Sequence, residues 1–168
     1  MDEDHVLTVC TFCGHSRIYG SADYLKVQLQ NTVQHLIAAE HFICFLVGNY
    51  GDFDHMAASV CLDAKKQHPH IIVDLVIPYY RPQIDEYDKV RYGRFDNVIF
   101  PELEGTPYQY RIIKANQYMV DSADAVIAFV TATYGGAAKT LKYAIGKKKR
   151  IFYLVNSAVN NGRREDYI

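Results

Sequence analysis

The sequence predicts an α/β fold: a Rossmann-like, doubly wound, mainly parallel sheet of about six strands, with helices on both faces. Two observations lead to this prediction. Short apolar runs alternate along the chain with longer stretches whose apolar residues recur at helical spacing. The short runs are continuously apolar rather than alternating, which is typical of parallel strands that are buried on both faces.

The elements follow one another in a regular order. The expected strands cover residues 7–12, 42–47, 71–77, 97–100, 125–130 and 150–155. The expected helices cover residues 22–39, 53–66, 108–123 and 137–146. The third strand stops at Pro78, which has no amide hydrogen for a strand ladder. Residues 79–96 have no clear period, and a connection this long is often functional. One domain over residues 1–155 is expected, with a polar tail over 156–168.

The composition bounds the possible partners. The 168 residues are enough to build a core without disulfides or metals. With 18 basic and 19 acidic residues the net charge is −1, so the basic excess of nucleic-acid-binding proteins is missing and nucleic acid is an unlikely partner. No apolar run is long enough to cross a membrane, and the acidic start does not resemble a secretory signal. We therefore expect a cytoplasmic protein without a membrane partner, and a homodimer is possible.

The cysteines predict neither a metal nor a redox site. Cys10 and Cys13 form a Cys-x-x-Cys, but they lie along an expected strand, where residues three apart point to opposite faces. No second pair completes a zinc tetrad, and the histidines are scattered. We expect buried structural cysteines, no metal and no cofactor.

Three strands end in glycine-containing loops that lead into helices. These loops are Gly14-His15-Ser16, residues 48–51 (Gly-Asn-Tyr-Gly) and Gly135-Gly136. In open α/β sheets, ligands bind at the carboxyl ends of the strands, where amides and a helix N-terminus attract an anion. The loops therefore predict a site for a phosphate or a phosphorylated ribose, although glycines also end strands for conformational reasons alone. The Gly-x-Gly-x-x-Gly and Walker A signatures are absent, which excludes a nicotinamide dehydrogenase or an ATPase.

Several polar side chains accompany these loops, and each has a functional and a structural interpretation. Asp54 either contacts a ribose or caps its helix. Arg111 either binds a phosphate or is an exposed helix residue. Asn116 lies on an apolar helix face, so it needs a partner, which is either a loop or the ligand. The predicted ligand-binding residues are Gly14, His15, Ser16, Gly48, Tyr50, Gly51, Asp54, Tyr79, Arg111, Asn116, Tyr134, Gly135, Gly136 and Thr140.

The remaining candidates lie in or beside the loops. His15 either donates a hydrogen bond to a phosphate or base, or is satisfied by backbone. Tyr50, Tyr79 and Tyr134 follow three different strands and could stack on a base, although 14 tyrosines make chance placement easy. Thr140 bonds either a phosphate or its own backbone.

Three motifs of the chain occur in the order of a known family. Cys13-Gly14-His15 is similar to a Gly-His start, residues 48–54 match a Gly-x-x-Gly-x-Asp element, and residues 120–130 with 134–140 match a late strand and glycine turn. Over about residues 7–155 the chain resembles a small stand-alone member of the SLOG superfamily. The resemblance implies a Rossmann-like fold that binds nucleotides or nucleotide-derived ligands. Its relatives include DNA-processing proteins, cytokinin-activating phosphoribohydrolases and bacterial sensor domains.

The chain departs from the phosphoribohydrolase branch of that superfamily. The branch carries Pro-Gly-Gly-x-Gly-Thr-x-x-Glu, whose glutamate serves hydrolysis. Here Tyr134, Ala138 and Lys142 stand in place of the proline, the third glycine and the glutamate. Glycosidic chemistry needs a carboxylate, so either Asp54 or Asp121 has taken that role or the site only binds.

These observations leave three hypotheses in order. The first is a sensor or sequestering module for a nucleotide-derived small molecule, such as an ADP-ribose-like signal. The second is an enzyme acting at an N-glycosidic bond, with Asp54 as its catalytic carboxylate. The third is a DNA-associated protein, which the charge balance disfavours.

Overall fold

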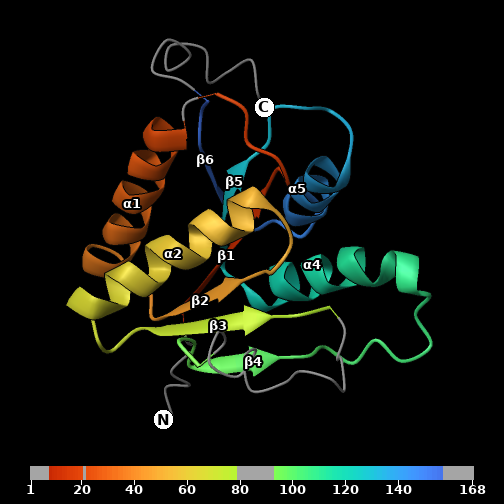
Figure 1. Ribbon diagram of the computed structural model, residues 1–168, viewed down its shortest axis with the longest axis horizontal. Helices are drawn as coiled ribbons and strands as arrows, with labels where there is room; N and C mark the ends of the chain where they lie inside the picture. The colour runs from red at the N-terminus through yellow and green to blue at the C-terminus, as the bar shows by residue number, and fades with distance from the viewer. Residues whose placement is uncertain (1–7, 21, 79–92, 157–168) are drawn as a thin grey trace.

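A single six-stranded sheet organises the part of the chain that the structure describes. The computed structural model describes residues 8–20, 22–78 and 93–156. The strands are β1 (Val9–Gly14), β2 (Cys44–Val47), β3 (Ile72–Val76), β4 (Asn97–Ile99), β5 (Ala125–Phe129) and β6 (Arg150–Tyr153). They pair in the order β4-β3-β2-β1-β5-β6, and every pairing is parallel (Figure 1). The predicted fold class is confirmed.

The strand order reverses on either side of β1. Strand β1 pairs with β2 on one edge, where Cys10 faces Phe45, and with β5 on the other, where Cys10 faces Ala125. The chain builds the sheet outward from β1 to β4 and then returns to the opposite side of β1 for β5 and β6. In sheets of this kind the reversal leaves a crevice at the carboxyl ends of the two central strands. The three glycine loops follow β2, β1 and β5, which are neighbours in the sheet.

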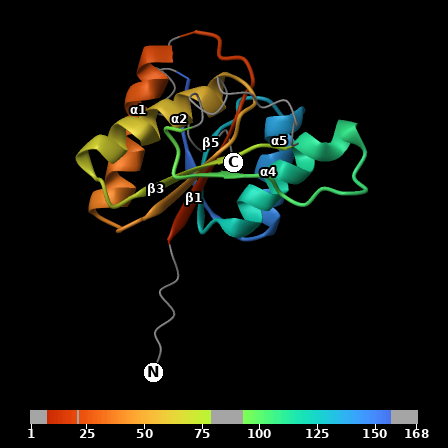
Figure 2. The same cartoon turned by 60° about the horizontal axis from the view of Figure 1, so that its bottom comes forward.

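Helices cover both faces of the sheet. Helices α1 (Ala22–Ala38) and α2 (Asp52–Gln67) pack together on one face, and α4 (Arg111–Ser122) and α5 (Gly136–Gly146) pack together on the other (Figure 2). A short 3-10 turn, η1 (Tyr108–Tyr110), precedes α4. The helix expected from residue 108 therefore begins as this turn.

Several strands are shorter than the apolar runs that predicted them. Phe42, Ile71 and Leu154 are buried but lie outside the strands. An apolar run records burial, and burial continues for one or two residues beyond the last ladder pair. Residues 1–7, 79–92 and 157–168, which include part of the long connection and most of the tail, lie outside the described residues.

The two cysteines of the Cys-x-x-Cys point to opposite faces of the sheet, as predicted. Cys10 belongs to the large core under α1 and α2, and Cys13 belongs to a smaller core with Val120 of α4 and Ala144 of α5. Both thiols are free and buried. Burial raises the pKa of the Cys13 thiol to about 12, so it stays protonated and unreactive at neutral pH.

In the described ranges, none of the helices combines the length and hydropathy that crossing a membrane requires.

The start of α2 is fixed by the loop that follows β1. The amide of Asp52 donates to the carbonyl oxygen of Ser16 at 2.8 Å, and the amide of Phe53 donates to that of His15 at 3.3 Å. In return, the amide of Ile18 donates to the Asp52 carboxylate at 3.0 Å. We call these three bonds the loop clamp. They fix the backbone of residues 15–18 against a helix that begins about 35 residues later in the chain.

Gly51 makes the loop clamp possible. Its φ of 98° is a conformation that residues with a side chain rarely adopt. A β-carbon at this position would lie 2.4 Å from the Cα of Ser16.

We expect Gly51→Ala to lower the free energy of unfolding by about 1–3 kcal/mol, because it combines backbone strain with a clash against the facing loop. Urea denaturation measures this difference. Gly146→Ala is the matched control, since φ there is not positive and nothing lies within 4 Å of an added β-carbon. Equal stabilities of the two variants would contradict the role given to Gly51.

Candidate functional site

A cleft of about 490 Å³ opens at the carboxyl ends of β1 and β5. Most of the predicted ligand-binding residues line it, namely Gly14, His15, Ser16, Tyr50, Asp54, Asn116, Tyr134, Gly135, Gly136 and Thr140. They come from the loops after β1, β2 and β5 and from the first turns of α2, α4 and α5. A cleft of this volume falls in the range of small-molecule sites. The reversal of strand order therefore brings the three loops to one concave site.

Four predicted residues are placed differently. Gly48 and Gly51 support the site from behind: a β-carbon at Gly48 would lie 2.7 Å from the Asp54 carboxylate, and Gly51 permits the loop clamp. The Arg111 guanidinium donates to the carbonyl oxygen of Thr106 at 3.3 Å and does not line the cleft. Tyr79 lies outside the described residues.

The N-terminus of α5 opens into the cleft. Its N-cap is Gly135, with a φ of 95°, and no side chain caps the helix. Its first turn has no acidic residue, and Gly136 and Ala137 line the cleft. Nothing lies within 4 Å of the position that a β-carbon on Gly135 or Gly136 would take. Uncapped amides and an uncompensated helix dipole attract anions.

The N-terminus of α2 differs from that of α5, although a glycine loop precedes both. Two of its first amides already bond the loop clamp. Its first turn contains Asp52 and Asp54, whose negative charges compensate the helix dipole. Of the two helix starts, α5 is therefore the one suited to a phosphate.

Asp54 brings a carboxyl group with a shifted pKa to the cleft. Its Oδ2 accepts a hydrogen bond from the Tyr50 amide at 2.9 Å, so the carboxyl group does cap α2. Burial raises the pKa of the Asp54 carboxyl to about 6, and the hydrogen bond from Tyr50 offsets part of that rise. Near neutral pH both protonated and ionised forms are populated. The group can accept hydrogen bonds from sugar hydroxyls or exchange a proton.

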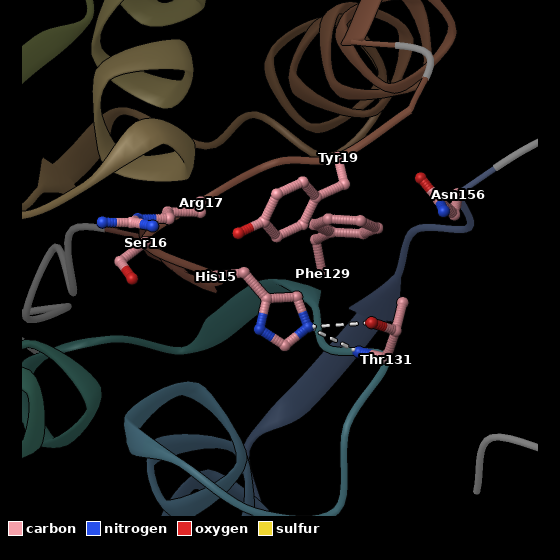
Figure 3. Close-up of a pocket in the computed structure, with 7 residues that line it drawn as sticks. All are labelled: His15, Ser16, Arg17, Tyr19, Phe129, Thr131 and Asn156. Atoms are coloured by element: carbon pink, nitrogen blue, oxygen red, sulfur yellow. Dashed lines mark hydrogen bonds between the residues drawn. The ribbon is translucent and has the colours of Figure 1, made fainter.

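His15 separates the cleft from a second pocket (Figure 3). The Thr131 amide donates to its Nε2 at 2.8 Å, and the Thr131 hydroxyl lies 3.0 Å from the same nitrogen. Because Nε2 accepts from an amide, the ring is neutral and carries its proton on Nδ1. Burial lowers the pKa of His15, which favours the neutral ring. His15 therefore offers a ligand an N–H donor.

Sequence reasoning did not find the second pocket. It measures about 330 Å³ and is lined by His15, Ser16, Arg17, Tyr19, Phe129, Thr131 and Asn156. Only His15 and Ser16 belong to the predicted site. Phe129 was expected to be a buried strand residue, and Asn156 was assigned to the tail. No periodicity or motif marks these positions, because the pocket depends on how the ends of β5 and β6 meet the loop after β1.

Two other predicted side chains differ in their bonding. The Thr140 hydroxyl donates to the carbonyl oxygen of Gly136 at 3.0 Å, which is the backbone alternative stated for it. Asn116 is half-buried on α4, and its side chain lines the cleft. Tyr50 and Tyr134 are exposed at the rim, where their rings are open to solvent.

The other carboxylates considered have structural partners. Asp121 accepts a hydrogen bond from the Tyr143 hydroxyl at 2.8 Å, and Asp124 accepts one from the Val9 amide at 2.8 Å. Val9 begins β1, so the Asp124 bond lies at the opposite end of that strand from the cleft. Asp121 also does not line the cleft, which leaves Asp54 as the carboxylate there. In the described residues no group of three histidine, cysteine or acidic side chains is arranged to hold a metal.

Comparison with known proteins shows similarity of fold alone. No family model and no curated protein matches the sequence. Among solved structures, the DNA processing protein A of Helicobacter pylori, described for its single-stranded DNA binding mode, matches with a TM-score of 0.61 and 16% identity, over 90% of this chain and 67% of that one. The protein of the same name from Streptococcus pneumoniae matches with a TM-score of 0.61 and 15% identity, over 96% and 57%. The Moco carrier protein of Chlamydomonas rheinhardtii matches with a TM-score of 0.52 and 16% identity, over 87% and 74%.

These neighbours support the Rossmann-like fold that the sequence resemblance implies. The chain spans 57% of the length of the Streptococcus pneumoniae protein. Membership of the SLOG superfamily stays a prediction.

The pKa of Asp54 predicts a pH-dependent stability. A carboxyl whose pKa is higher in the folded state stabilises the fold below about pH 4, and that contribution is lost as the pH rises through about 6. We expect Asp54→Asn to raise the free energy of unfolding at pH 8 by about 1–3 kcal/mol, because the amide retains an acceptor for Tyr50 without a buried charge. Urea denaturation at pH 8 and pH 4 measures the difference, which should disappear at the lower pH.

Asp63→Asn is the control, because Asp63 lies exposed on the same helix. It should change stability by less than about 0.5 kcal/mol at either pH. A destabilised Asp54→Asn variant at pH 8 would contradict the burial cost assigned to the carboxylate.

Proposed function

We propose that this chain binds a phosphorylated, nucleotide-derived small molecule in the cleft at the carboxyl ends of β1 and β5. The observation that carries the proposal is the open N-terminus of α5, which shares the cleft with the Asp54 carboxyl group. An anion-attracting helix start and a hydrogen-bond acceptor in one cleft fit a sugar phosphate.

Each part of such a ligand has a matching group. The phosphate lies at the amides of Gly136 and Ala137. The sugar hydroxyls donate to Asp54. The base stacks on Tyr134, whose exposed ring stands directly before the glycine turn. The role that follows is that of a sensor or sequestering module.

Substitution at the start of α5 tests the phosphate position. We expect wild-type protein to bind adenosine monophosphate at high micromolar concentration or below. Gly136→Asp should weaken this binding by at least about tenfold, because it places a negative charge beside the phosphate. The same change should leave stability unchanged or raise it by about 0.3–1 kcal/mol, since an acidic first-turn residue suits the helix dipole. Calorimetric titration and thermal unfolding measure the two effects.

Gly136→Asn is the matched control, because it adds a side chain of the same size without the charge. It should retain most of the affinity. Equal losses in both variants would indicate obstruction rather than repulsion, and failure of the wild type to bind any nucleotide tested would end the proposal.

A second candidate function is hydrolysis of an N-glycosidic bond. The observation that favours it is the raised pKa of Asp54, because a carboxyl near pH 6 can stabilise developing positive charge on a sugar or exchange a proton. Lys142, which replaces the glutamate of the hydrolytic branch, lies exposed on α5. Binding without hydrolysis is therefore the first choice.

Chromatography distinguishes the two functions. If the protein is a hydrolase, wild-type protein releases free base from nucleoside monophosphates, and Asp54→Asn lowers the rate by at least about a hundredfold while it still binds adenosine monophosphate. If wild-type protein releases no base, the protein only binds.

A DNA-associated role has less support. The Helicobacter pylori neighbour is described for single-stranded DNA binding. This chain has a net charge of −1 and so lacks the cationic excess that drives binding to a nucleic acid backbone.

A further inference from the structure

We propose that the pocket beyond His15 is a second subsite of the same ligand, which takes a planar ring carrying an N–H donor. The ligand would then be a two-part molecule: a phosphate ester in the cleft, joined through its phosphates to a second ring. This inference rests on the proposed function, because it assumes that the cleft holds the phosphate.

The pocket has the shape and the side chains for a ring. Phe129 from the end of β5 and Tyr19 from the loop after β1 present aromatic surface to it (Figure 3). Thr131 and Asn156 supply polar groups at its other side. Aromatic walls with a few fixed polar groups are the usual environment of a bound heterocycle.

An unpaired amide oxygen indicates what the ring must carry. Asn156 Oδ1 is buried and accepts no hydrogen bond from the described residues. Its backbone is well fixed, because the Gln28 side chain bonds both backbone groups of the preceding Val155, at 2.6 and 3.0 Å. A buried acceptor without a partner is costly, and a ligand N–H that reached it on rearrangement of the amide would remove that cost.

The two pockets are adjoining parts of one groove. His15 and Ser16 line both of them, and the cleft continues from Thr131 in the second pocket to Ala132 in the first. Arg17 lies at the same loop and lines the second pocket. A diphosphate that passes over Ser16 would meet the positive charge of Arg17 on its way from the α5 N-terminus.

Two probes that differ by the second half test this arrangement. Calorimetric titration of the whole chain compares adenosine monophosphate with diadenosine diphosphate, which carries a second adenosine on a diphosphate link. We expect diadenosine diphosphate to bind about tenfold more tightly. Asn156→Ala should reduce this gain to below about threefold and leave the affinity for adenosine monophosphate unchanged.

The stability of the variant separates recognition from structure. Because Oδ1 of Asn156 has no partner among the described residues, its removal should not lower the thermal midpoint. Tyr19→Ala is the second variant. Its ring is 73% exposed, so the change should leave folding intact and also reduce the gain.

The outcomes are distinct. If adenosine monophosphate and diadenosine diphosphate bind equally, the second subsite is wrong and the proposed function stands. If diadenosine diphosphate binds more tightly but neither variant reduces its gain, the second ring lies elsewhere and the proposal is again wrong. If neither probe binds, the proposed function fails together with the second subsite.

Discussion

The loop clamp is the contact on which the site depends. Three hydrogen bonds join the loop after β1 to the start of α2 across a long sequence separation. They fix the backbone of His15 and Ser16, the two residues that line both pockets. They also occupy the first amides of α2, which leaves the start of α5 as the open helix terminus in the cleft. One set of backbone bonds thus decides both the shape of the groove and the position of its anion-attracting end.

Most of the fold could be predicted from the sequence because it depends on local pattern. Apolar runs and helical periodicity located every strand and helix described above, and glycine-containing loops located the edge of the sheet where the cleft lies. Element ends were less accurate, as Phe42 and Ile71 illustrate, because burial extends beyond the hydrogen-bonded ladder. The site was predicted in outline for the same reason, since parallel strands bring the loops that follow them to one edge.

What the sequence could not supply depends on contacts between distant segments. The glycine loops before α2 and α5 look alike as sequence, yet only the structure shows that α2 spends its first amides on Ser16 and His15. The second pocket combines residues from three separate segments, and Asn156 follows the last strand without any motif to mark it. Arg111 was a reasonable phosphate ligand by chemistry, but its guanidinium bonds a nearby loop carbonyl.

The loop clamp also bears on how this site could diversify during evolution. It uses the carbonyl oxygens of His15 and Ser16, and every residue type has such an oxygen, while the side chains of the same residues face the pockets. Replacement of these side chains can therefore change which ligand is recognised without removing the bonds that hold the loop. The facing position, Gly51, has no such freedom, because its φ and its contact with Ser16 exclude a side chain. Recognition and support are thus separated within one short loop.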